Sequence, residues 1–312
     1  MDIEAIEDAW ARIRNHVKRT RLERSETLSE RLGRNVFVKL ELFQKTGSFK
    51  IRGAFNKLLS LSKDELKNGV VAVSGGNHAQ AIAHAAKVLG LDAVVLMPES
   101  TPKNYVDATR GYGARVELVS TIADAFAQAD RYRSEGRVFV HPFDDELVMA
   151  GQGTLGLEIF DDLPEVTDVI VSIGGGGLMS GVSAALKARK PDVKMWGVET
   201  VGADAMSQAL NAGHPVTLPA ITSIAKTLGA PSVSDATFLA AKEYLETVTV
   251  VTDVEAVAAL EFILERLKIL TEPAASCTLA AAEKLKADLG SHVVLILCGG
   301  NLALNDLCSY PR

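Results

Sequence analysis

The stretch Asp168-Val169-Ile170-Val171-Ser172-Ile173-Gly174-Gly175-Gly176-Gly177-Leu178 decides the fold class of this chain. Residues 168–173 are rich in β-branched side chains and predict a buried strand. Four glycines follow, and a helical pattern then runs to Lys190. A strand that leads through a glycine turn into a helix is the first part of a βαβ unit. The stretch therefore predicts an α/β fold.

Further strands and helices alternate on both sides of this stretch. Apolar runs predict strands at 70–73, 93–97, 114–119, 138–141, 193–198 and 293–297, and residues 79–89 predict a helix. The runs lack alternation, which is typical of parallel strands covered on both faces. Several units fall between residues 71 and 147, so we expect a small inserted domain there and a large domain made of 1–70 and 148–312. Gly151-Gln152-Gly153-Thr154 is interpreted as the crossing point between them.

The composition argues against several classes of protein. The chain has 312 residues, 47% of them hydrophobic, a net charge of −6 and no basic run, so we expect no nucleic-acid partner. Its first residues, Met1 to Asp8, are acidic where a targeting peptide would be basic. No apolar stretch approaches the roughly 20 residues of a membrane span, so we expect no membrane partner. Three cysteines without CxxC spacing favour reduced thiols and a cytoplasmic location.

The glycines from Gly174 to Gly177 form the first candidate site. Ligands of open α/β sheets bind beyond the carboxyl ends of the strands. A glycine turn lets backbone N–H groups converge and the helix start adds positive potential, so the loop is interpreted as a phosphate cradle. A nicotinamide dinucleotide is the alternative, with Glu199 as its ribose contact. The match is imperfect, because Ser180 stands where that fingerprint places its third glycine.

A second loop, Ser74-Gly75-Gly76-Asn77-His78, also joins a predicted strand to a predicted helix. Its small residues, backbone donors and amide suit a carboxylate ligand. An ordinary helix cap by Ser74 or Asn77 explains the same pattern. His78 is a candidate ligand or base, although a single histidine at a helix start is more often structural.

Two further residues stand out only together with these loops. Lys50 lies in Ser48-Phe49-Lys50-Ile51-Arg52-Gly53-Ala54, at the start of a segment, 49–59, that looks helical. Most lysines are surface charges, but a lysine desolvated beside a cofactor becomes a nucleophile and a base. Cys298 ends the last predicted strand and precedes two glycines. Its thiol is either a contact to a ring or a small apolar filler.

These four motifs, in this order, resemble the threonine and serine dehydratase group of pyridoxal-phosphate (PLP) enzymes. The resemblance runs from about Ala9 to the end, and Glu272-Pro273 matches a further landmark. It implies the tryptophan synthase β-like fold, with two open, twisted, mostly parallel sheets flanked by helices and PLP in the cleft between the domains. It also implies that Lys50 holds PLP as a Schiff base. The implied cofactor-binding residues are Phe49, Lys50, Asn77 (to the 3′-oxygen), Gly174, Gly175, Gly176, Gly177, Leu178 and Cys298 (to the ring nitrogen). The implied carboxylate-binding residues are Ser74, Gly75, Gly76, Asn77 and His78.

The resemblance implies an ammonia-lyase for a small-molecule substrate. It would remove water and ammonia from L-threonine or L-serine, leave a 2-oxo acid, and work as a homodimer. The chain ends soon after Cys298-Gly299-Gly300-Asn301, so it looks like the short, catabolic form without a regulatory domain. The alternatives are a dehydratase for phenylserine or hydroxyaspartate and a serine racemase. Outside this class they are a nicotinamide-dependent oxidoreductase and a non-catalytic amino-acid binder.

Three departures from the family pattern bear on the reaction. Related racemases use a serine as second base where this chain has Gly75, which predicts dehydration with little racemisation. Relatives bind Mg²⁺ or another cation through a glutamate, a carbonyl and an aspartate. The equivalents are Glu199, Ala203 and Ala205, so the aspartate is missing and a solvated turn is the alternative. Lys226 stands where many relatives have an acid, which points to a different side-chain preference.

Overall fold

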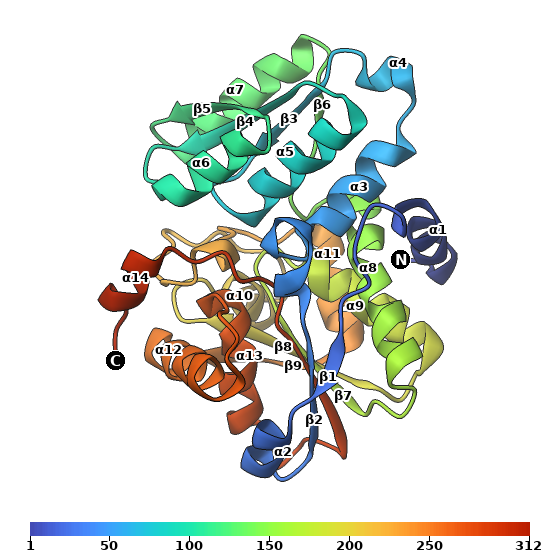
Figure 1. The fold of residues 1–312 in the computed structure, drawn as a ribbon, viewed down its shortest axis with the longest axis vertical. Helices are drawn as coiled ribbons and strands as arrows, with labels where there is room; N and C mark the ends of the chain where they lie inside the picture. Colours follow the sequence, from blue (N-terminus) through green and yellow to red (C-terminus); the bar gives the residue numbers. More distant parts are fainter.

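A computed structural model describes residues 1–312 and contains two open sheets, one above the other in Figure 1. The larger sheet has six strands in the order β1-β2-β10-β7-β8-β9, and only the edge strand β1 runs antiparallel to its neighbour. Its strands are Leu22–Arg24 (β1), Asn35–Lys39 (β2), Asp168–Ser172 (β7), Lys194–Thr200 (β8), Leu245–Val251 (β9) and His292–Ile296 (β10).

The smaller sheet has four parallel strands in the order β5-β4-β3-β6. They are Val70–Val73 (β3), Ala93–Pro98 (β4), Arg115–Val119 (β5) and Val138–Phe139 (β6). The predicted α/β class with two mostly parallel sheets is confirmed. The strand predicted at 138–141 is shorter than expected, because only its first two residues pair with β3.

Helices cover both faces of each sheet. The helices are Ile3–Ile13 (α1), Glu26–Leu32 (α2), Lys50–Ser60 (α3), Lys63–Leu66 (α4), Asn77–Leu89 (α5), Lys103–Gly111 (α6), Ile122–Ser134 (α7), Glu146–Asp162 (α8), Gly177–Arg189 (α9), Ala205–Ala212 (α10), Asp235–Tyr244 (α11), Asp253–Phe262 (α12), Pro273–Lys284 (α13) and Leu304–Ser309 (α14). None of them has both the length and the hydrophobicity needed to cross a lipid bilayer.

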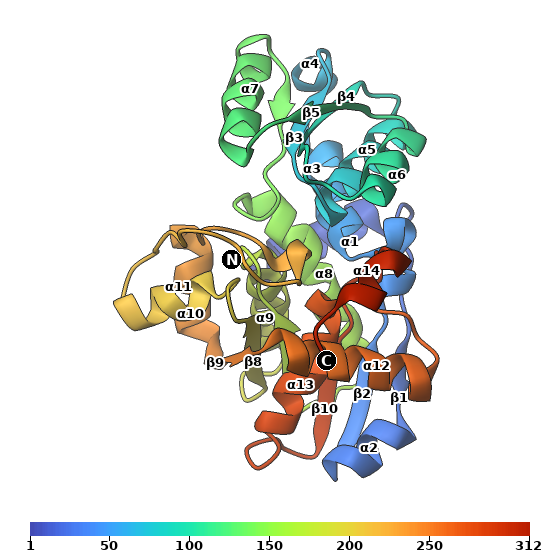
Figure 2. The same ribbon diagram turned by 90° about the vertical axis from the view of Figure 1, so that its left-hand side faces the viewer.

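Alternate residues of the small sheet enter different cores. Val71 and Val94 pack with α7, whereas Val70 and Val95 pack with α5 and α3 on the opposite face. Figure 2 shows α7 on one side of the strands and α5 and α6 on the other. Burial on both faces explains why these strands read as continuous apolar runs, and each such valine contributes about 1.5–3 kcal/mol. Helix α3 belongs to the expected large domain but packs in this core of the small sheet. The expected domain boundary between residues 70 and 71 therefore stays a prediction.

The segment Gly151 to Thr154, which was interpreted as a crossing point between domains, lies inside helix α8, and the crossing itself stays a prediction. Its glycines allow close helix packing instead. A Cβ on Gly151 would lie 2.6 Å from the Cα of Gly53 on α3, and one on Gly153 would lie 2.9 Å from the carbonyl oxygen of Gly181 on α9. Helix α8 therefore holds α3, which begins at Lys50, at backbone distance.

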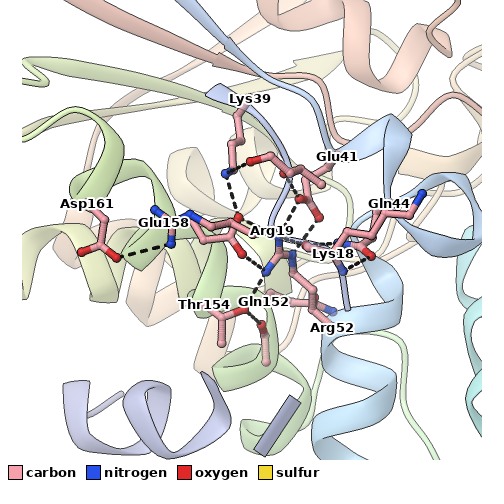
Figure 3. A network of polar contacts seen from close by, with 12 residues as sticks. Lys18, Arg19, Lys39, Glu41, Gln44, Arg52, Gln152, Thr154, Glu158 and Asp161 are labelled. Atoms are coloured by element: carbon pink, nitrogen blue, oxygen red, sulfur yellow. Dashed lines mark hydrogen bonds and ion pairs between the residues drawn. The ribbon is translucent and has the colours of Figure 1, made fainter. Parts of the chain in front are cut away.

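A buried charge cluster fixes the other side of α3 (Figure 3). The guanidinium of Arg52 pairs with Glu41 at 2.7 Å and with Glu158 at 2.8 Å. Lys39 also pairs with Glu158, at 2.7 Å. All four side chains are almost fully removed from solvent, and two positive charges balance two negative ones. Burial alone would raise the pKa of Glu41, but the nearby guanidinium outweighs it and the pKa is lowered.

Candidate active site

Lys50 is the first residue of α3, and its amine points at the segment that follows β6. Its Nζ donates a hydrogen bond to the carbonyl oxygen of Pro142 at 2.7 Å and lies 5.2 Å from the centre of the Phe49 ring. Burial lowers the pKa of Lys50 to about 8, although the nearby Cys298 acts in the opposite direction. A pKa near 8 leaves about a tenth of the amine neutral at pH 7, and the neutral form is the nucleophile and base.

The four-glycine loop lies between β7 and α9, as the sequence predicts. None of the N–H groups from Gly174 to Gly177 donates a hydrogen bond within the protein. Gly176 has a φ of +94°, a left-handed conformation that glycine adopts readily, and directly precedes the first residue of α9. A Cβ on Gly175 would lie 2.1 Å from the ring of Phe143, so only glycine fits there. Free donors at a helix start can hold a phosphate.

The loop Ser74 to His78 has the same construction at the end of β3. The Ser74 hydroxyl accepts from the N–H of Gly76 at 3.1 Å. The N–H groups of Gly75, Asn77 and His78 donate to no group of the protein. These free donors lie at the first turn of α5, where the helix dipole adds positive potential. The loop is thus able to bind a carboxylate.

The imidazole of His78 forms a hydrogen bond within the protein and does not contribute to this carboxylate-binding loop. Its ring is buried, and Nε2 lies 2.9 Å from the carbonyl oxygen of Val140, to which it donates. Burial and the positive charge of Lys50 lower the pKa of His78 to about 3, so the ring is neutral at physiological pH. The side chain does not titrate near pH 7. His78 can therefore contribute its backbone N–H to an anion site, but not a proton near neutrality.

Cys298 lies beside the lysine and is neutral. The N–H of Phe49 donates to the carbonyl oxygen of Cys298 at 3.0 Å, and Ser48 pairs with Gly299 in an isolated bridge. Burial, reinforced by the charge of Glu272, raises the pKa of Cys298 to about 12. Its sulfur is 3.4 Å from the hydroxyl of Ser172. A neutral thiol, not a thiolate, is therefore what Cys298 offers to a ligand.

Several residues at this site had no role assigned to them in the sequence analysis. The carboxylate of Glu272 accepts from Asn77 at 2.8 Å and from Thr227 at 2.9 Å. Asn301 donates to the amide oxygen of Asn77 at 2.8 Å. Phe143 packs on the glycine loop. A glutamate before a proline at a helix start was a usable signal for Glu272. No comparable signal marks Phe143, whose place depends on tertiary packing.

Three other residues of the sequence interpretation lie elsewhere or have other partners. Leu178 is the second residue of α9: its side chain is buried in the core, whereas its backbone N–H, like those of the glycine loop, donates no hydrogen bond within the protein. The side chain of Lys226 is exposed, whereas its neighbour Thr227 reaches Glu272. The two carboxylate oxygens of Glu199 accept from the N–H groups of Met206 and Ser207 at 2.9 and 2.7 Å.

The expected cation site lacks a cluster of ligands. Burial raises the pKa of Glu199 to about 8. Ala203 is buried and contributes only a backbone carbonyl. Nowhere do three His, Cys, Asp or Glu side chains gather in an arrangement suited to a metal ion. Backbone N–H groups of α10 thus already form hydrogen bonds with the Glu199 carboxylate that a cation would need.

The residues around Lys50 fit PLP. The glycine loop supplies donors for a phosphate, Lys50 an amine for an aldehyde, and Asn77 and Cys298 polar groups for a ring. The hydroxyl of Ser48, next to Phe49, is fully buried and has no hydrogen-bond partner within the protein. Such an orphaned group beside an amine and a glycine cradle is typical of a ligand site.

Comparisons with known proteins agree with this chemistry. Residues 13–299 match the family described as pyridoxal-phosphate dependent enzyme. The chain is 42% identical to the L-threonine ammonia-lyase of Thermotoga maritima, covering 97% of this chain and 76% of that one. It is 37% identical to the catabolic L-threonine dehydratase TdcB of Escherichia coli, covering 97% and 94%. The solved structure of maize serine racemase matches with a TM-score of 0.95 at 36% identity, covering 99% and 96%.

Proposed function

Because the chain belongs to the family of pyridoxal-phosphate-dependent enzymes, we propose that it is an ammonia-lyase that converts L-threonine or L-serine into a 2-oxo acid and ammonia. The observation that carries the proposal is the enclosed amine of Lys50, which lies among an N–H cradle, a carboxylate loop and a neutral thiol. Relatives named L-threonine ammonia-lyase and L-threonine dehydratase cover nearly the whole chain.

Each part of the site has a task in this reaction. PLP, when bound, supplies an electron sink for the charge left at the α-carbon. The N–H groups of Gly75, Asn77 and His78 bind the substrate carboxylate. Lys50, held by Pro142, takes the α-proton because its lowered pKa leaves a usable fraction of neutral amine near pH 7.

Cys298 favours elimination over other outcomes. With a pKa of about 12, its thiol stays neutral and places no negative charge at the ring nitrogen. With PLP bound, such a neutral partner would not stabilise a proton on that nitrogen, and the cofactor would hold the charge at the α-carbon less strongly. This would favour prompt loss of the β-hydroxyl. The elimination releases one water and the later hydrolysis consumes one, so the net reaction converts the amino acid into a 2-oxo acid and ammonia.

Serine racemisation is the second candidate, because a serine racemase has a very similar structure. Racemisation needs a proton acceptor on the face of the cofactor opposite Lys50. Gly75, at the position of the racemase serine, offers none, so we propose that elimination predominates. The homodimer, the cytoplasmic location and the division into 1–70 plus 148–312 and 71–147 remain part of the proposal.

The test is a substrate panel with matched variants. We expect 2-oxo acid from L-threonine or L-serine, assayed beside phenylserine and hydroxyaspartate because of Lys226. Lys50→Ala should lower the rate by about 10²–10⁴-fold, as expected for loss of a general base. The exposed Lys63 serves as control, since Lys63→Ala should leave the rate unchanged. A yellow protein inert toward the whole panel would point to an amino-acid binder, and a colourless protein that binds a nicotinamide would contradict the proposal.

A further inference from the structure

The side-chain amide of Asn77 is held from both ends by residues distant in sequence. Its Nδ2 donates to Oε1 of Glu272 at 2.8 Å, and its Oδ1 accepts from Nδ2 of Asn301 at 2.8 Å. Asn77 begins α5 beside the small sheet, whereas Glu272 precedes α13 and Asn301 follows β10 of the large sheet. The amide therefore links the carboxylate loop to the other half of the molecule.

The partners leave Asn77 only one orientation. Nδ2 of Asn301 also donates to the carbonyl oxygen of Thr46 at 2.8 Å, and a carbonyl can only accept. Asn301 must therefore present nitrogen, so Asn77 must present oxygen to it. At the other end, Oε1 of Glu272 already accepts from the hydroxyl of Thr227. A flipped Asn77 would place nitrogen against nitrogen at one end and oxygen against oxygen at the other.

The backbone before Lys50 is shaped to seat Asn301. Thr46 has a φ of 63°, a left-handed conformation that a β-branched residue rarely adopts. Such strain persists where the surrounding contacts enforce it. The next residue, Gly47, has a φ of +71°, and a Cβ there would lie 2.5 Å from Oδ1 of Asn301. A side chain at position 47 would displace Asn301.

The arrangement leaves one hydrogen of Asn77 unused. Its Nδ2 carries two hydrogens, and only the contact with Glu272 is made within the protein. Oε2 of Glu272 is also buried and has no hydrogen-bond partner. Burial raises the pKa of Glu272 to about 7, although the hydrogen bonds from Thr227 and Asn77 oppose this. Nδ2 of Asn77 and the Glu272 carboxyl group lie beside Gly299, which follows Cys298: a Cβ on Gly299 would be 3.1 Å from Nδ2 of Asn77 and 2.7 Å from Oε1 of Glu272.

We propose that Glu272 and Asn301 are positioning residues that lock the Asn77 amide with its free N–H toward the 3′-oxygen of PLP. The inference rests on the proposed function, because it needs PLP at this site. The lock supplies a fixed donor for an oxygen that carries negative charge. Without it, Asn77 can rotate and present its own oxygen, which repels the 3′-oxygen.

Three variants test the lock in the holoenzyme. Asn301→Asp removes the donor and turns Asn77 around, whereas Glu272→Met removes the acceptor. Both should shift the visible absorption band of the bound cofactor and weaken PLP binding to the apoenzyme by roughly 10- to 100-fold, the range for an unpaired buried polar group. Glu272→Gln keeps an acceptor for Asn77 and Thr227, so its spectrum and PLP affinity should stay near wild type.

The decisive comparison is made in an Asn77→Ala background. There, Asn301→Asp should change neither the band nor the PLP affinity further, because its target is gone. An equal change with and without Asn77 would overturn the inference, and so would wild-type spectra and affinities for both Asn301→Asp and Glu272→Met. If the wild-type protein forms no visible band with PLP, the proposed function itself fails, so the two failures are distinguishable.

Discussion

The amine of Lys50 donates a hydrogen bond to the carbonyl oxygen of Pro142 at 2.7 Å, between residues 92 positions apart. This contact crosses from the start of α3 to the segment that follows β6 of the small sheet. The same segment places Phe143 against the glycine loop. A single stretch of chain therefore orients the lysine and closes one side of the phosphate cradle.

The lowered pKa of Lys50 predicts how PLP capture by the apoenzyme depends on pH. Only the neutral amine attacks an aldehyde, and the neutral fraction rises as the pH passes through the pKa of about 8. The capture rate, followed by visible absorption after mixing apoenzyme with PLP, should rise to a plateau above pH 8. A rate that keeps climbing toward pH 10.5 would show an unperturbed lysine.

Restoring the racemase serine should not by itself give a racemase. A Cβ on Gly75 would lie 2.6 Å from the hydroxyl oxygen of Thr101, and Thr101 is stiff because it is β-branched. Gly75→Ser alone should form little D-serine from L-serine, measured by chiral chromatography. Gly75→Ser with Thr101→Ala should form more, and Thr101→Ala alone none. Wild-type interconversion as fast as pyruvate formation would contradict this.

Loss of Arg52 should be costly for stability. Arg52→Met leaves Glu41 without its ion-pair partner in a fully buried place. Removing one member of such a cluster typically costs about 3–5 kcal/mol. The free energy of unfolding in urea should fall by that amount. The exposed pair of Arg131 with Glu135 is the control, and Arg131→Met should cost less than about 0.5 kcal/mol. Equal losses would refute a special role for the cluster.

Activity should not depend on a divalent cation. Both oxygens of Glu199 already accept backbone N–H groups, those of Met206 and Ser207, so neither is free for a cation. Dialysis against EDTA should leave the rate of 2-oxo acid formation and the melting temperature unchanged, with or without added Mg²⁺. A loss of rate that Mg²⁺ restores would mean that a cation displaces the N–H groups of Met206 and Ser207.

The sequence predicts all four strands of the small sheet and strands β7, β8 and β10 of the large sheet, but it misses β1, β2 and β9. Strands β3, β4, β7 and β10 are buried on both faces, so their apolar runs are unambiguous. Strands β1, β2 and β9 of the large sheet carry polar side chains such as Glu23, Asn35 and Glu246 and were not predicted, although β2 lies inside the sheet. The glycines of α8 were not predicted to lie in a helix, because only tertiary structure shows that other helices approach them.

The candidate site shows the same limit. The glycine loop and the Ser74 loop are local motifs, so their free N–H groups follow from sequence alone. The contacts that orient Asn77 join residues 195 and 224 positions apart, which no local pattern contains. Lys50 is distinguished by desolvation, and desolvation is a property of the folded chain.

Reduction of the holoenzyme with borohydride tests the central claim most directly. The reagent fixes PLP to the lysine that holds it, and mass spectrometry of the digested protein identifies the modified peptide. The account predicts one equivalent of PLP per chain, attached to Lys50 in Ser48-Phe49-Lys50, and none in Lys50→Ala. Attachment to another lysine, or no attachment in a protein that still forms 2-oxo acid, would contradict it.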